Sequence, residues 1–366
     1  MTESTILNIP ELIEPISEDK PTGDNIREDS SPTSDYYEIK DIRTQARANE
    51  RKALEDEDLS FVPGDWKPIV QKSPALLKER TKDIEVCAWL IEALTRTNGF
   101  KGLAESFELT RQLFDLYWDG MYPEEDEDGV ETKIAPLIGL NGFGSDGALI
   151  MPIKCIPITQ GKDFGPFALW EYTQAYETDG ITDPEKKQQK IENGAITLEM
   201  VRQAASDTSP IYFRQIKAEL DSAIEAYAGL TASIDRCCAS DPQPTSNIRD
   251  ALEKCRTALI DLAGDKLADP EEEAEAEGDD AAGEGGETSA PKKDKSVNNR
   301  EAALKNLGEI ALFFKKTEPH SPISYALEQC IRWSKMTLPE LMAELVQDPG
   351  ARDSFFKLTG IPSQEN

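Results

Sequence analysis

The sequence contains a single histidine, His320, and no long apolar run. A Ser-His-Asp or Cys-His nucleophile system would have to use this one side chain, which lies in the proline-bounded stretch Glu318-Pro-His-Ser-Pro322. We interpret His320 as a structural or interface residue. One histidine also excludes a multi-histidine metal site within one chain. No apolar stretch reaches the ~18 residues that predict a membrane-spanning helix.

Basic residues are scarce: 40 Lys and Arg stand against 70 Asp and Glu, giving a net charge of −30. Nucleic acids and anionic membrane surfaces require a clustered basic surface, so we expect neither as a partner. The N-terminus has no basic start followed by a long apolar stretch, so no signal peptide is expected. Six scattered cysteines without a C-x-x-C pair favour free thiols in a reducing cytosol: Cys87, Cys155, Cys237, Cys238, Cys255 and Cys330.

Two motifs resemble ligand sites but lack parts that those sites need. Gly142-Phe-Gly144-Ser-Asp-Gly147 matches G-x-G-x-x-G, yet an extended, proline-containing stretch follows it where a dinucleotide site needs a helix. We predict a turn. Glu124–Gly129 resembles half of a calcium loop, but its twelfth position is Ala135 rather than a glutamate. We therefore expect no cofactor and no metal site.

Helical periodicity dominates the chain and predicts a mainly α fold. Cys87, Leu90, Ile91 and Leu94 form one apolar stripe that should end at Asn98-Gly99, and a second helix should follow. Residues 134–158 differ, because prolines, glycines and alternating apolar residues suggest extended segments there. We expect a small β-like arm in that stretch.

Serine-proline pairs mark further helix starts. Ser73-Pro74 and Ser209-Pro210 each predict an N-cap followed by proline at the first helical position. The long helix after Ser209 and a second one after Ser246 are joined by a short, proline-containing turn. We expect them to pack as an antiparallel helical hairpin.

An acidic segment separates the two ends of the chain. Asp269 to Glu287 holds ten carboxylates and no Lys or Arg, a composition that cannot bury enough apolar surface to offset the entropy of ordering. We predict four parts: an N-terminal domain at 1–195, a helical hairpin at 196–268, a disordered acidic linker at 269–298, and a helical oligomerisation module at 299–366.

The C-terminal module is small enough for a neighbouring copy to complete its core. In its second helix, Ala326, Leu327, Cys330 and Ile331 are expected to face inward. Ordinary core packing is the alternative interpretation for each aromatic residue of the module. The candidate residues for contact with other copies or partners are Phe313, Phe314, Glu318, His320, Ile323, Tyr325 and Trp333.

The order and spacing of many short motifs resemble the TssA family of the bacterial type VI secretion system, with its ImpA N-terminal domain. The tail, with Glu318-Pro-His-Ser-Pro322 and Arg332-Trp333, is similar to the shorter TssA type, whereas the acidic segment departs from the family pattern. The matching stretches of the body include Trp66, Trp89-Leu90, Gly99-Phe-Lys-Gly102-Leu103, Tyr117-Trp118, Leu140-Asn-Gly142 and Asp146-Gly-Ala-Leu-Ile150.

The resemblance implies a cytoplasmic, non-enzymatic assembly factor. Such a protein forms a homo-oligomeric ring through its C-terminal region and contacts baseplate, sheath and tail-tube proteins. Two alternatives stay open. One is a metal-dependent hydrolase or transferase using Glu124 to Asp128. The other is an acidic, chaperone-like binder that needs the segment 269–288 rather than the tail, and deletion of that segment would separate it from the scaffold hypothesis.

Overall fold

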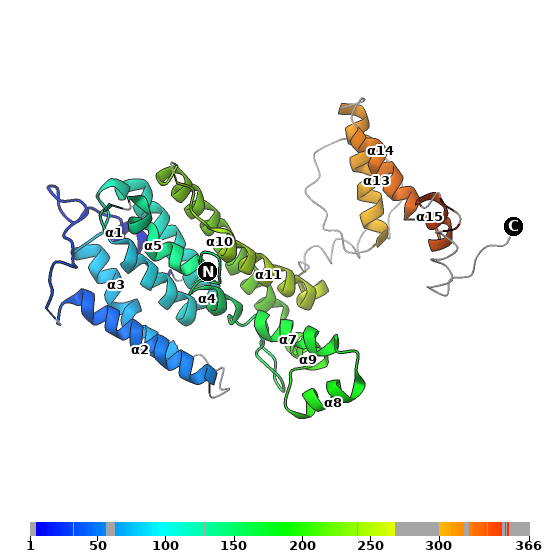
Figure 1. Ribbon diagram of the computed structural model, residues 1–366, viewed down its shortest axis with the longest axis horizontal. Coiled ribbons are helices and arrows are strands. Elements are labelled where there is room, and N and C mark those ends of the chain that lie inside the picture. Colours follow the sequence, from blue (N-terminus) through cyan, green and yellow to red (C-terminus); the bar gives the residue numbers. More distant parts are fainter. Residues whose placement is uncertain are drawn as a thin grey trace, which may run out of the picture. The chain divides into compact units, whose positions relative to one another are not determined.

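The chain folds into two compact units, Met1–Asp280 and Ala281–Asn366. They are seen in a computed structural model (Figure 1). The structure describes residues 5–31, 33–55, 63–127, 129–239, 241–267, 300–317, 322–334, 336–345, 348 and 350. The acidic segment at 269–298 therefore lies outside the described residues.

The regular structure of the described residues is helical, which confirms the predicted mainly α fold; pairing between extended segments is limited to isolated bridges. The body contains α1 (Ile9–Leu12), α2 (Asp35–Glu55), η1 (Pro63–Trp66), α3 (Lys67–Glu79), α4 (Ile84–Tyr117), η2 (Trp118–Gly120), α5 (Val130–Asn141), α6 (Ile150–Lys154), α7 (Leu169–Asp179), α8 (Pro184–Glu192), α9 (Leu198–Asp207), α10 (Pro210–Cys237), α11 (Ser246–Ala263) and η3 (Gly264–Leu267).

The β-like arm predicted at 134–158 is wrong. Most of this stretch is α5 and α6, and its one strand-like pairing among the described residues is the bridge between Pro157 and Ala168. Ile134, Leu137 and Leu140 are buried at three-residue spacing on α5, although Pro136 lies inside the helix. Helical spacing therefore outweighed the proline and glycine content.

Helix α4 lies at the centre of the body and is buried along almost its whole length. Its apolar residues surround the helix instead of forming one stripe, so α3, α5 and α10 all pack against it. Gly99, at φ +61°, interrupts the helix at the predicted break. α4 thus consists of two helical halves that meet at a kink, and both halves contribute buried residues to the core.

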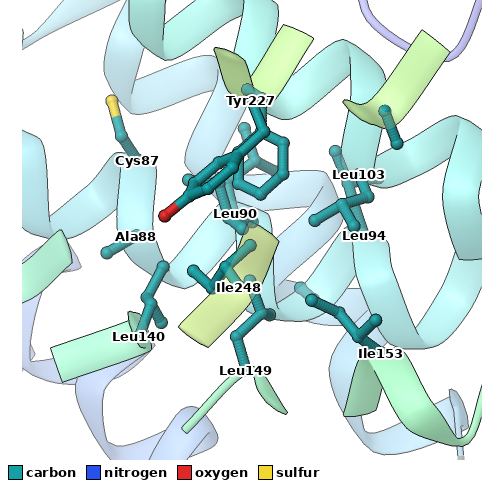
Figure 2. Packing of buried hydrophobic residues seen from close by; sticks show 14 of the residues in the cluster. Cys87, Ala88, Leu90, Leu94, Leu103, Leu140, Leu149, Ile153, Tyr227 and Ile248 are labelled. Atoms are coloured by element: carbon teal, nitrogen blue, oxygen red, sulfur yellow. The ribbon is translucent and has the colours of Figure 1, made fainter. Parts of the chain in front are cut away.

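The predicted hairpin is present as α10 and α11, which pack against each other, and α10 also packs along α4. Figure 2 shows Tyr227 of α10 and Ile248 of α11 among Leu90 and Leu94 of α4 and Leu140 of α5. The hairpin therefore shares one core with the N-terminal helices. A small second core of Phe167, Ala175, Val201 and Ala204 lies under α7 and α9.

A polar cluster fixes the N-terminus of α4. The Asp83 carboxylate caps the helix by accepting hydrogen bonds from the backbone N–H of Glu85 (2.8 Å) and Val86 (3.2 Å). The same buried carboxylate forms a two-point ion pair with Arg27, which also contacts Glu85 at 2.7 Å. Tyr36 of α2 donates to Glu85 at 2.9 Å. The cluster ties the N-terminal segment and α2 to the start of α4.

Lys82 is fully buried without an ion-pair partner in the part of the chain that the structure describes. Its ammonium donates to the backbone carbonyls of Leu12 and Leu77, each at 2.7 Å. Burial lowers the pKa of Lys82 to about 8, because removal from water disfavours the charged form. This lysine joins α1 to the end of α3.

The second unit contains α13 (Arg300–Thr317), α14 (Pro322–Trp333) and α15 (Leu338–Leu345). Helices α13 and α14 pack together, and Ala311 is their most deeply buried apolar residue among those described. Within the described ranges of both units, the helices are too short or too polar to cross a membrane.

Replacement of Asp83 by alanine should destabilise the body by about 3–5 kcal/mol, since it removes a helix cap and leaves Arg27 without its buried partner. Asp83→Asn should cost less than alanine, because the amide oxygen can still accept from the backbone N–H groups. Urea unfolding followed by circular dichroism measures both differences. A cost below about 1 kcal/mol for alanine would contradict this account.

The matched control is Asp24→Ala. Asp24 pairs with Lys20, and both side chains are more than half exposed. Exposed ion pairs contribute between about 0 and 1 kcal/mol, so this variant should unfold close to the wild-type urea concentration.

The buried lysine should make stability rise with pH. Lys82 loses its proton at about pH 8 in the folded chain but near 10.5 in the unfolded chain, so the unfolded chain binds more protons between these values. Raising the pH from about 7.5 to 9.5 should therefore increase the unfolding free energy of the wild type relative to Lys82→Met by about 2 kcal/mol. Parallel denaturant titrations of both proteins measure this difference.

The tyrosines and cysteines are the same in both proteins, so their contribution to the pH dependence of stability cancels in the comparison. A difference that is flat or falls with pH would show that Lys82 is not responsible.

Candidate interaction surfaces

The predicted interface residues of the C-terminal module are only partly described. Ile323 and Tyr325 on α14 are 43% and 61% exposed. Phe314 is half-buried on α13. Phe313 belongs to α13, but its side chain lies outside the described part, as do Glu318 and His320 entirely.

Trp333 is a packing residue rather than a free contact. Its ring is half-buried, and its indole N–H donates to the Glu344 carboxylate of α15 at 3.1 Å. Gln329 also donates to Glu344, at 2.7 Å, and Arg332 pairs with it. These bonds, that from Trp333 above all, lower the pKa of Glu344. The carboxylate therefore fixes α15 against the end of α14.

The structure adds apolar residues that sequence reasoning did not select as contacts. Ile310, Leu312 and Leu345 are 46%, 56% and 52% exposed. On α13, Ile310 and Leu312 flank the buried Ala311 at about 100° to either side, so the apolar surface is wider than the face that α14 covers. Apolar width beyond the buried stripe was the sequence signal that could have identified them.

The inward direction predicted for Ala326 and Cys330 is wrong for this unit, because both are exposed. Together with Ile323 they occupy positions i, i+3 and i+7 on α14, which share one helix face. Leu327 and Ile331 are half-buried beside them. Among the described residues, packing therefore covers one side of the apolar stripe of α14 and leaves the other side exposed.

The acidic stretch at 124–129 forms a turn before α5. Glu124 and Glu125 are exposed, and Asp126 accepts a hydrogen bond from the Thr132 hydroxyl at 2.7 Å. Asp128 lies outside the described residues. In the part that the structure describes, no three Asp, Glu, His or Cys side chains are arranged to hold a metal ion.

The stretch from Gly142 to Gly147 is a turn, as predicted, and it joins the N-terminal helices to the hairpin. Asn141, the last residue of α5, accepts a hydrogen bond through Oδ1 from the backbone N–H of Ile248 at 3.0 Å. Ile248 is the third residue of α11, whose own N-cap, Thr245, makes no side-chain cap bond. A residue 107 positions away thus caps α11.

The fold and its parts resemble proteins of one secretion system. Residues 13–142 match the family described as ImpA, N-terminal, type VI secretion system. The chain is 25% identical over 353 residues to the type VI secretion system component TssA1 of Pseudomonas aeruginosa, with 94% of this chain and 96% of that protein covered.

The fold is similar to a solved domain as well. The N-terminal domain of the TssA component from Burkholderia cenocepacia, which includes the conserved ImpA_N region, matches with a TM-score of 0.61 at 23% identity. This match covers 74% of the present chain and 98% of the solved one. Residues 13–142 thus match the ImpA N-terminal family of the type VI secretion system, and nearly the whole chain is similar to a TssA component of such a system.

Proposed function

We propose that this chain is a cytoplasmic, non-enzymatic scaffold that organises assembly of the baseplate and of the sheath and tail tube of a type VI secretion system. Its C-terminal module, 299–366, would join copies into a ring. The body, consisting of the domain at 1–195 and the hairpin at 196–268, would be presented by that ring. Partner proteins would then meet several bodies at once.

The observation that carries this proposal is the exposed apolar surface of the C-terminal module. Ile310, Leu312, Ile323, Tyr325 and Leu345 are each at least 43% exposed, and Ala311 alone is fully buried among the apolar side chains that the structure describes on these three helices. Apolar surface of this kind in so small a unit favours contact with another copy. Full burial of an apolar side chain contributes about 1.5–3 kcal/mol, so covering the exposed half of one of these contributes about half of that.

The mechanism is multivalency. Each body binds its partner through a limited surface, but copies held in one ring raise the effective concentration of the remaining bodies once the first has bound. Several weak contacts then act as one strong contact. The residues at 269–298, which the sequence predicts to be a disordered linker, would set how far each body reaches from the ring.

The test is the oligomeric state of full-length protein. Light scattering at micromolar concentration should give an oligomer, and a truncation after residue 295 should be monomeric. Leu312→Asp and Tyr325→Asp should each weaken association at least about tenfold, since each places a charge where an apolar side chain becomes covered.

The matched control is Lys316→Asp, which adds an acidic group at an exposed, polar position of the same helix as Leu312. It should leave the oligomer intact. A full-length protein that is monomeric, or an oligomer that Lys316→Asp disrupts as strongly as Leu312→Asp, would overturn the proposal. Negative-stain images of the purified protein would distinguish rings from dimers.

A further inference from the structure

Phe143 is the most exposed large apolar side chain in the described part of the chain, at 82%. It lies in the turn between α5 and α6, where Gly142 and Gly144 adopt φ +86° and +69° on either side of it. Gly147 leaves no space for a side chain, because a Cβ atom there would come 2.1 Å from the carbonyl oxygen of Leu140. The turn conformation therefore requires glycine at these positions.

The turn is also attached to α11. The Asn247 amide donates to the carbonyl oxygens of Asn141 at 3.1 Å and Ser145 at 3.4 Å. The turn therefore presents the phenyl ring of Phe143 to solvent on an anchored backbone. Aromatic residues presented in this way are common contact residues, because the backbone loses little conformational entropy on binding.

A cavity of about 420 Å³ adjoins this turn. Gly142, Ser145 and Gly147 form one wall, and Arg43 and Arg47 of α2 form another. Ala88, Trp89 and Leu140 add apolar surface from α4 and α5. The lining thus combines apolar surface with two guanidinium groups and with the carboxylates of Glu85 and Asp146.

The charges around the cavity are mostly paired. Arg43 pairs with the buried Glu92, whose second carboxylate oxygen accepts no hydrogen bond. Glu85 is held by Arg27 at 2.7 Å and Tyr36 at 2.9 Å. Asp146 lies 3.5 Å from Lys154.

Arg47 differs from these groups. It is half-buried and has no hydrogen bond or ion pair with the residues that the structure describes. Its pKa is lowered, mainly by burial; the nearby Glu92 carboxylate raises it, and the guanidinium groups of Arg43, Arg96 and Arg51 lower it further. A half-buried cation without a partner is unfavourable, and a carboxylate with two oxygens would match its geometry.

We propose that this cavity and Phe143 form a docking site for an acidic segment of a partner protein, with a carboxylate at Arg43 and Arg47 and an apolar side chain against Phe143. This inference rests on the proposed function only in taking the partner to be a secretion-system protein. Peptide binding at the site does not require a ring. A free phosphate would use the guanidinium groups but not the phenyl ring, so the exposed Phe143 favours a peptide.

The experiment uses full-length protein and a pool of fluorescein-labelled twelve-residue peptides with a fixed central Glu-Glu-Asp and variable apolar flanks. Fluorescence anisotropy should show saturable binding, and Arg47→Gln and Phe143→Ser should each weaken it about tenfold or more. A pool with Gln-Gln-Asn at the centre should bind at least tenfold more weakly. Thermal melting should confirm that both variants stay folded.

Two matched controls define specificity. Arg51→Gln removes an exposed arginine one turn further along α2, outside the cavity lining, and Leu116→Ser removes another exposed apolar side chain. Each should change affinity less than twofold. Equal loss in Arg51→Gln, or equal binding of the amide pool, would overturn the proposal, because either result would indicate nonspecific charge attraction.

Other occupants would give distinct results. Displacement by millimolar inorganic phosphate without an effect of Phe143→Ser would indicate an anion site and overturn peptide docking. Binding only after deletion of residues 269–287 would show that the chain's own acidic segment fills the cavity, which also overturns docking of a partner. Absence of binding at 1 mM peptide would also overturn the proposed docking site. Light scattering of each variant would show separately whether the oligomer persists.

Discussion

The body of this protein is organised by a single requirement: α4 must be covered on nearly every side. A helix with one apolar stripe needs one neighbour, but from Ile84 to Thr95 the residues of α4 are buried around almost the whole circumference, and only after Gly99 does a partly exposed polar side remain. Neighbouring helices must therefore come from distant parts of the chain. Helix α10 covers one side although more than a hundred residues separate parts of the two helices, and α3 and α5 cover others.

This requirement also explains the polar groups in the interior. Where several helices converge on α4, their ends meet inside the protein, and the unpaired backbone groups of those ends need partners. Asp83 supplies acceptors at the start of α4, Lys82 supplies donors to the carbonyls of Leu12 and Leu77, and Asn141 supplies an acceptor at the start of α11. In each case a polar side chain forms the hydrogen bonds that backbone groups at a helix end would otherwise lack.

Periodicity in the sequence was sufficient to predict the long helices. It was insufficient to predict contacts between residues that lie far apart in the sequence. The break at Gly99 and the pair of helices after Ser209 and Ser246 followed from local signals. Ser73-Pro74 did not begin a helix, because α3 starts at Lys67 and carries Pro74 in its interior. Nor could the sequence indicate that Asn141 caps α11, since that bond depends on tertiary packing. In the C-terminal module the indole N–H of Trp333 donates to Glu344 of α15, a bond that depends on the packing of two helices, while Ile310 and Leu312 are exposed.

The cap on α11 shows that the matched segment and the structural unit end at different residues. The family match ends at residue 142, directly after the side chain that completes a helix beginning at Ser246. A fragment cut at that boundary would expose the side of α4 that α10 covers and would discard the recipient of Asn141. The matched segment is thus shorter than the stretch of chain that covers α4 and contains both partners of the α11 cap.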